Sequence, residues 1–162
     1  RGRVHIKKGH PKLMKVSLRR SILPDITQLH PHLRNQDLNE LKALGIKPRT
    51  SLMYGYLHGE CFTAMCEDTV LCMYGVIPKE TGGCIWMLSR KGIEKFALPI
   101  SRLAKAEIER MSKKYSMLHN IVDERNKIVL RWLKMLGFKF GSSYIIGPNK
   151  HSFKEFYLWA QL

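Results

Sequence analysis

The stretch that decides the fold is residues 122–138, VDERNKIVLRWLKMLGF, which read as one helix with its own start and stop. Asp123 is a favourable N-cap, and Glu124 places negative charge in the first turn, where the helix dipole stabilises it. Apolar residues recur at spacings of three and four along one face, with basic residues between them: Ile128, Val129, Trp132, Leu133 and Leu136. Gly137 ends the helix, because glycine adopts a left-handed C-terminal cap without steric cost.

The segments on either side of this helix indicate strands. Residues 118–122 alternate between two faces, which is typical of a strand that leads directly into the helix. Apolar sequence resumes at Phe138, directly after the glycine. The unit is therefore a strand, a short turn that carries Asn126, an amphipathic helix, a glycine stop and a second strand.

This unit resembles a segment of the GNAT superfamily, the acetyl-CoA-dependent N-acyltransferases. The resemblance lies in Asn126, the amphipathic helix after it, and Gly137-Phe138 at its end. The form with Arg131-Trp132-Leu133 inside the helix is similar to a phage branch, which includes GNAT-like internal virion or assembly proteins of short-tailed phages. The resemblance covers the chain from about residue 14 to the C-terminus and implies a GNAT-like fold.

Composition limits the class of protein. The 162 residues, 44% of them hydrophobic, are enough for one globular domain, which we place at residues 14–162. No run reaches the roughly 18 apolar residues of a membrane span, and the N-terminus lacks the apolar core of a signal peptide. The four cysteines show no spacing typical of zinc sites, so we expect reduced thiols. We expect a location in the cytoplasm of a host cell, or in a virion.

Positive charge is the unusual feature of the composition. Twenty-eight lysines and arginines against thirteen acids give a formal net charge of +15. Such a protein attracts polyanions, namely nucleic acid, an acidic protein or a phosphorylated cofactor, although solvated basic faces are an equally good explanation. Residues 1–13 contain five basic residues and no acid, and we interpret them as a basic arm that contacts a phage structural protein or nucleic acid.

The remaining periodicity predicts the order of elements. Residues 14–20 read as a strand, and short helices follow near residues 24–29, 35–44 and 50–57, the last capped by Thr50 or Ser51. Three strands follow at 60–66, 69–77 and 84–88, with Pro78 ending the second. A helix after Pro99, the unit described above and a hairpin of 138–146 and 152–160 complete the chain. We expect a mixed, mostly antiparallel sheet of six to seven strands with helices on both faces, an α/β (α+β) fold.

The resemblance implies a site for acetyl-CoA. In the superfamily, acyl-CoA lies where the fourth and fifth strands separate, and backbone amides of the next helix bind its pyrophosphate, as suits an anion at a helix N-terminus. The positions that correspond are Met87, Leu88, Ser89, Arg90, Lys91, Gly92 and Asn126. The loop has a single glycine where the family usually has more, and Asn126 can instead serve as a helix-start hydrogen-bonding residue. Trp86, Met87 and Trp132 are candidates for an acyl slot or for plain core.

The catalytic groups are less well defined. Many family members have a tyrosine acid seven residues after the asparagine, where this chain has Leu133, so we consider Tyr144 or Tyr157 for that role. His119 is the best single candidate for a general base, and a structural histidine is the alternative. Other candidates for the base are the glutamates around the three strands: Glu60, Glu67 and Glu80.

Two classes of function follow. The first is an acetyl-CoA-dependent N-acyltransferase that acts on an amine of a protein or small molecule. The second is a catalytically silent GNAT-like phage virion or assembly protein that binds a protein partner or DNA through its basic surfaces. A stand-alone nucleic-acid binder is a third, less favoured class, because the aromatics fall on strand faces that we expect to be buried.

Overall fold

A seven-stranded sheet organises the protein, with the strand order β1-β2-β3-β4-β5-β7-β6. The computed structural model describes residues 14–161, so the predicted basic arm lies outside the described residues. All neighbouring strands are antiparallel except β4 and β5. The strands are β1 (Ser17–Arg20), β2 (Glu60–Cys66), β3 (Thr69–Lys79), β4 (Gly82–Ser89), β5 (Met117–Asp123), β6 (Lys139–Ile146) and β7 (His151–Trp159). The predicted mixed, mostly antiparallel sheet is confirmed.

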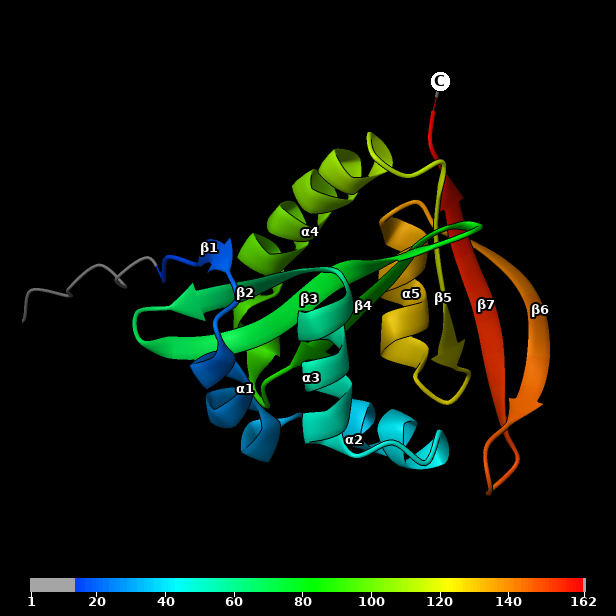
Figure 1. The fold of residues 1–162 in the computed structure, drawn as a ribbon, viewed down its shortest axis with the longest axis horizontal. Helices are drawn as coiled ribbons and strands as arrows, with labels where there is room; N and C mark the ends of the chain where they lie inside the picture. Colours follow the sequence, from blue (N-terminus) through cyan, green and yellow to red (C-terminus); the bar gives the residue numbers. More distant parts are fainter. Residues whose placement is uncertain (1–13, 162) are drawn as a thin grey trace, which may run out of the picture.

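Helices cover both faces of this sheet (Figure 1). They are α1 (Leu23–Leu29), α2 (Asn35–Ala43), α3 (Pro48–His58), α4 (Ala97–Ser112) and α5 (Lys127–Met135), with 3-10 turns at His30–His32 and Ile93–Phe96. Helices α1, α2 and α3 pack on one face, where Leu52 of α3 and Met73 of β3 share one buried cluster. Helices α4 and α5 pack on the other face, where Met111 and Leu133 share one buried cluster with Val122 of β5. The apolar character of both faces in β2 and β3 correctly predicted this arrangement.

Within residues 14–161, no helix combines the length and the apolar character that crossing a membrane requires. All four cysteines lie in this part of the chain as free thiols, and those of Cys61 and Cys72 are buried.

Several predicted boundaries are wrong. Pro78 does not end β3, which continues to Lys79. The register explains this, because β2 begins at Glu60 opposite Val76 and has no residue opposite Pro78, so the missing proline N–H breaks no bond on that side. Helix α3 begins at Pro48, in the first turn, rather than at Thr50 or Ser51.

The start of the decisive helix also differs from the prediction. Asp123 is the last residue of β5, paired with Phe153 of β7, and the N-cap of α5 is Asn126, whose side chain accepts a hydrogen bond from the Val129 N–H. Asp123 instead accepts hydrogen bonds from the backbone and side chain of Arg125. The buried face also differs from the prediction, because Ile128 is 58% exposed whereas Leu133 is buried. Gly137 ends the helix at φ +96°, as predicted.

Candidate functional site

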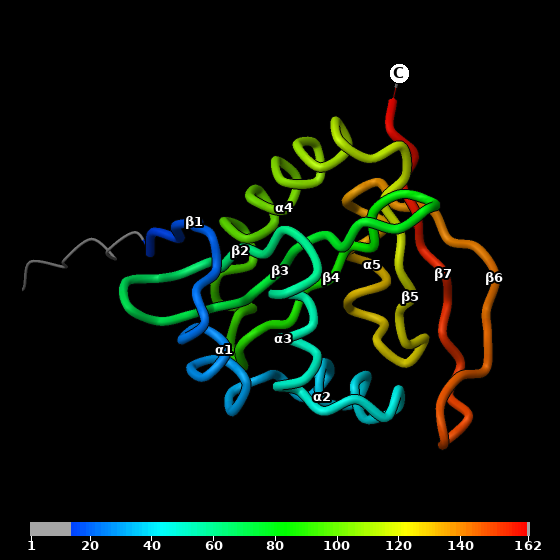
Figure 2. The backbone as a smooth tube through the Cα atoms, in the orientation of Figure 1, coloured from blue at the N-terminus to red at the C-terminus, as the bar shows by residue number. Residues whose placement is uncertain are grey.

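The site begins where β4 and β5 separate. The two strands pair in parallel only at Gly83 with Leu118 and at Cys84 with His119. One residue further along β5, the two strands are connected by a side chain and no longer by backbone pairing, because Asn120 Nδ2 donates to the carbonyl oxygen of Ile85 at 2.6 Å. Beyond this contact the strands diverge (Figure 2).

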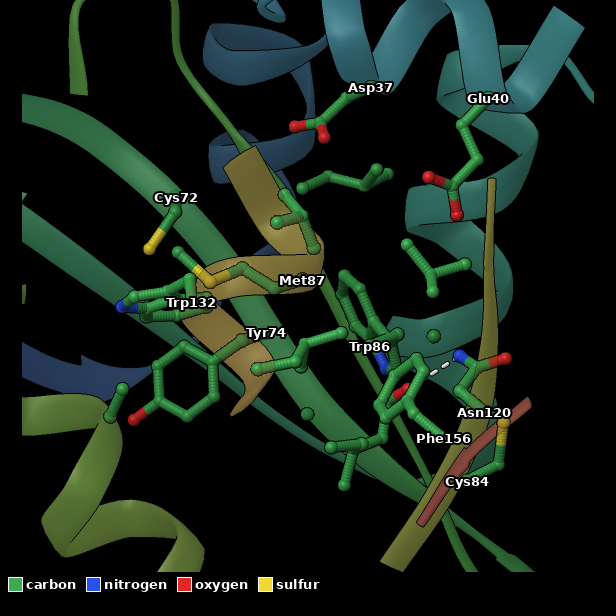
Figure 3. A pocket seen from close by; sticks show the side chains of 18 of the residues that line it. Asp37, Glu40, Cys72, Tyr74, Cys84, Trp86, Met87, Asn120, Trp132 and Phe156 are labelled. Carbon is green, nitrogen blue, oxygen red and sulfur yellow. Dashed lines mark hydrogen bonds between the residues drawn. The ribbon is translucent and has the colours of Figure 1, made fainter. Parts of the chain in front are cut away.

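A cavity of about 410 Å³ occupies the gap between the strands and reaches both faces of the sheet. Its lining is mostly apolar and comes from α2 and α3 on one face and from α4 and α5 on the other. Trp86 lies at its centre in Figure 3, with Met87, Tyr74 and Trp132 on one side and Glu40 and Asn120 on the other. A cavity that passes through a sheet gives two molecules separate routes to one point.

The free edge of β4 presents backbone groups to this cavity. The carbonyl of Ile85 and the N–H of Ser89 both point into the gap, the first toward Asn120 and the second toward the Asp37 carboxylate at 2.8 Å. Because successive residues of a strand alternate in hydrogen-bonding direction, the N–H and C=O of Met87 point into the gap as well. No described residue of β5 pairs with Met87. Met87 therefore supplies a donor and an acceptor at mid-cavity.

Buried polar atoms without partners gather around the cavity. Asn126 is 7% exposed; its Oδ1 caps α5 at 3.3 Å from the Val129 nitrogen, and its Nδ2 has no hydrogen-bond partner in residues 14–161. The indole Nε1 of Trp86 is also buried without a partner there. Both residues line the cavity. Since native proteins rarely leave buried donors unpaired, these two donors point to a ligand. Asn126 therefore caps α5, which is one of its two predicted roles, and its cofactor-binding role stays a prediction.

The structure places the predicted cofactor-binding residues in two groups. Met87, Leu88 and Asn126 line the cavity. Trp86 and Trp132, the candidates for an acyl slot, line it too, and the Trp132 indole donates to Ser101 Oγ at 3.0 Å, which connects α5 to α4.

The loop residues after β4 are occupied by the protein itself. The backbone N–H of Ser89 is taken by Asp37, and the Arg90 guanidinium donates to the Val70 carbonyl at 2.7 Å. The N–H groups of Arg90 and Lys91 donate to the carbonyls of Leu71 and His32. Gly92 adopts a left-handed conformation, φ +89°, and the Lys91 side chain is exposed. The charged side chains of this loop remain available to bind an anion, but most of its first backbone N–H groups are already bonded within the protein.

The predicted catalytic residues are not brought together. His119 lies in the paired part of β5, where its Nε2 is 3.3 Å from Thr81 Oγ1, and burial together with Lys79 lowers its pKa. Glu80 is exposed in the β3–β4 turn, and Tyr144 is 47% exposed on β6. None of the three lines the cavity between the strands. Their catalytic roles stay predictions.

Leu133, the position of the family's tyrosine, is buried and lines the cavity. Tyr74 brings a hydroxyl to the same wall, but this hydroxyl donates to Glu107 Oε2 at 2.9 Å. Burial, followed by the negative charge of Glu107, raises the pKa of Tyr74.

Sequence reasoning missed the carboxylates of α2. Asp37 and Glu40 line the cavity at the end where β4 and β5 stand apart, and Asp37 is only 5% exposed. Burial, then the negative charges of Asp37 and Asp123, raises the pKa of Glu40 to about 7. The only signal in the sequence was their spacing of three in a short helix, which places both on one face.

Comparison with solved structures reveals similar folds. The ribosomal-protein-S18-alanine N-acetyltransferase of Escherichia coli superposes with a TM-score of 0.69 at 10% identity, over 91% of this chain and 96% of that one. The spermidine N-acetyltransferase of Vibrio cholerae, solved with CoA and spermine, gives 0.62 at 13% identity, over 90% and 95%. A GNAT-family acetyltransferase of Bacillus anthracis gives 0.68 at 12% identity, over 90% and 95%.

No protein-family model and no curated protein sequence matches the chain. At these identities the superpositions establish the fold and no more. From β1 to β7, this chain has the fold of the GNAT N-acetyltransferases.

Proposed function

We propose that the protein is an N-acyltransferase that moves an acyl group from acyl-CoA, with acetyl-CoA as the expected donor, to an amine. The observation that carries the proposal is the cavity between β4 and β5, which an uninterrupted sheet would not contain. Its volume, its mostly apolar lining and its few convergent polar groups are typical of a small-molecule site. The fold shared with acetyltransferases, two of them solved with CoA, supports the same proposal.

The residues of this chain would act as follows. The thioester supplies an electrophilic carbonyl carbon and a thiolate leaving group. The Met87 N–H, which points into the gap, donates to the carbonyl oxygen and stabilises the negative charge that develops there during attack. Trp86, Trp132 and the apolar lining exclude water, which strengthens that hydrogen bond and protects the thioester from hydrolysis. The free Nδ2 of Asn126 donates to an amide oxygen of the pantetheine arm.

The basic side chains of the loop before α4 and of α4 itself suit the phosphates of CoA. Lys91 and Lys95 are exposed in the loop before α4, and Arg102 is exposed on the helix itself. Because the first amides of the loop are occupied, we propose that side-chain charge replaces much of the amide contact here.

Thermal shift with CoA tests the proposal. A ligand present at 100 times its Kd stabilises the folded state by about 2.7 kcal/mol, which corresponds to a rise in Tm of about 5–10 °C for a domain of this size. The control is adenosine 3′,5′-bisphosphate in 150 mM NaCl, which carries phosphates but no pantetheine. A larger shift with CoA than with this control supports the proposal, and equal shifts, or none at millimolar CoA, would remove it.

A second candidate function is a catalytically silent protein of a virion, phage-type as the sequence resemblance suggests, that binds an acidic protein or DNA. The net charge of +15 and the occupied loop amides favour it. It predicts binding to duplex DNA whose affinity falls steeply between 50 and 200 mM salt, together with no release of CoA from acetyl-CoA in the presence of amines. Turnover with any amine would exclude it.

A further inference from the structure

Two carboxylates line the end of the cavity where β4 and β5 are furthest from their pairing, and a third, that of Asp123, interacts with one of them. Asp37 and Glu40 come from α2, and Asp123 comes from the last residue of β5. Two of them have an arginine partner: Asp37 Oδ2 lies 3.0 Å from Arg34 Nε, and Asp123 Oδ2 lies 2.6 Å from Arg125. Glu40 makes no ion pair with any residue of the described chain (14–161). Its carboxylate accepts a hydrogen bond from the Asp123 backbone N–H, but of the three it is the one without a cationic partner in that part of the chain.

The charge of the cavity is opposite to that of the protein. The chain carries +15, yet the charged residues that line the cavity are one arginine and three acids, Arg34, Asp37, Glu40 and Glu107. No lysine lines it. A wall of this kind attracts a cation and repels an anion, whereas the exposed lysines of the loop before α4 do the opposite. The α2 wall of the cavity and the loop before α4 thus suit groups of opposite charge.

The residue that we propose to contact the pantetheine arm, Asn126, lies next to one of these carboxylates. Asn126, at the turn that follows Asp123, is 7% exposed, lines the same cavity and leaves its Nδ2 without a partner. The Asn126 N–H donates to the Asp123 carbonyl at 2.9 Å, so the free amide group and the Asp123 carboxylate are parts of one short turn. Trp86 Nε1, also unpartnered, lines the cavity as well.

We propose that Glu40 is the general base of the acyl transfer and that the acceptor is a cationic amine, which enters from the α2 side toward Glu40 and Asp37. This inference rests on the proposed N-acyltransferase function and specifies its acceptor and its base. Neither His119 nor Glu80 lines the cavity, whereas the Glu40 carboxylate points into it (Figure 3).

The step balances without any further reactant. The Glu40 carboxylate takes one proton from the ammonium group, and the neutral amine nitrogen attacks the thioester carbonyl carbon. The C–N bond forms, the C–S bond breaks, and the leaving thiolate takes the second proton of the nitrogen. Glu40 then releases its proton to solvent. The products are the amide, free CoA and one proton.

The surroundings of Glu40 suit a base that works near neutral pH. Burial, then Asp37 and Asp123, raises its pKa to about 7, while the Asp123 backbone N–H and the Arg34 charge act in the opposite direction. Arg125, which pairs with Asp123, is the other charge that interacts with Glu40. A base whose pKa lies near the working pH combines a useful fraction of the ionised form with useful basicity.

The test compares Glu40→Gln with the wild type and with Glu109→Gln, an exposed glutamate of α4, as the matched control. CoA release from acetyl-CoA is measured from pH 5.5 to 9 with spermine and with L-glutamate as acceptors, and each variant is also titrated with CoA in a thermal-shift assay. We expect Glu40→Gln to lose about 100-fold or more in kcat/KM with spermine and to lose the ascending limb near pH 7. The Glu109→Gln control should match the wild type, and both variants should keep the CoA-induced shift.

Three results would overturn the inference. Glu40→Gln could keep wild-type kcat/KM and the same pH profile. The wild type could prefer L-glutamate to spermine, which would contradict recognition of a cation. It could also transfer to neither acceptor although CoA still raises its Tm, which would reject Glu40 as the base for a cationic amine while CoA binding stands. Only the absence of a CoA-induced shift would reject the proposed function itself.

Discussion

Asn126 offers a prediction that separates folding from ligand binding, because the two ends of its amide group have different tasks. Its Oδ1 caps α5 through the Val129 N–H at 3.3 Å, and its Nδ2 is buried and unpartnered. Asn126→Ala removes both groups. Asn126→Ser keeps a capping oxygen and removes only the Nδ2 donor.

The expected magnitudes follow from these contacts. Loss of an N-cap costs about 0.5–2 kcal/mol, and the long 3.3 Å contact places this cap near about 1 kcal/mol, a fall in Tm of about 2–4 °C. We therefore expect that fall for Asn126→Ala and a much smaller one for Asn126→Ser. A hydrogen bond from Nδ2 to a ligand is worth about 0.5–1.5 kcal/mol, so both variants should bind CoA about 2- to 13-fold more weakly.

Calorimetric titration with CoA and thermal denaturation of the free proteins measure the two effects on the same samples. A serine variant that binds CoA as tightly as the wild type would show that the free amide does not serve the ligand. An alanine variant with an unchanged Tm would show that the cap contributes nothing. Either result would refute the reasoning about this residue.

Three further predictions concern stability. A Cβ on Gly55 would lie 2.3 Å from Cζ2 of Trp86, so in Gly55→Ala the indole must move within the cavity. We expect this variant to lose about 1–3 kcal/mol of stability in thermal denaturation and to bind CoA more weakly. An unchanged Tm contradicts this prediction. Burial raises the pKa of Asp25, but the hydrogen bonds that it accepts from Arg19 and other groups lower this pKa more in total. The ionised Asp25 therefore stabilises the folded state above its unfolded pKa of about 3.9, and this stabilisation disappears as the pH falls further. Asp25→Asn should cost about 2 kcal/mol of unfolding free energy at pH 7 and flatten the acid limb of the profile of stability against pH. For Glu40 the effect has the opposite sign, because its raised pKa means that folding penalises the ionised form from the unfolded pKa of about 4.3 upward, with the full penalty above pH 7. In urea denaturation, Glu40→Gln should therefore be about 1–2 kcal/mol more stable than the wild type at pH 8 and equal to it at pH 4. A variant that is less stable than the wild type at pH 8 contradicts this sign.

The order of elements was predictable from sequence because local patterns determine it. The 3.6-residue period of α5, the alternation in β5 and the Gly137 stop each depend on near neighbours in the chain. The boundaries were less predictable, because pairing between distant strands decides them. Asp123 is an excellent N-cap by composition, yet its pairing with Phe153 keeps it in β5 and passes the cap to Asn126.

The site was only half predictable for the same reason. The resemblance indicated Met87 and Asn126 as cofactor-binding residues, and both line the cavity, although cofactor binding itself stays a prediction. Asp37 and Glu40 lie in a short helix about 50 residues before the end of β4, and only the packing of α2 across the strand ends brings them to the cavity. No local pattern distinguishes them from other surface acids of a helix.

Hydrogen exchange with and without CoA tests the central claim most directly, because the claim concerns what lies between β4 and β5. We predict that CoA slows amide exchange in residues 85–89 of β4, where the Met87 N–H points into the gap, and in residues 126–129 at the start of α5, with little change in the β6–β7 hairpin. Unchanged exchange in β4 at a saturating CoA concentration would contradict the account, as would protection confined to exposed basic segments outside the cavity.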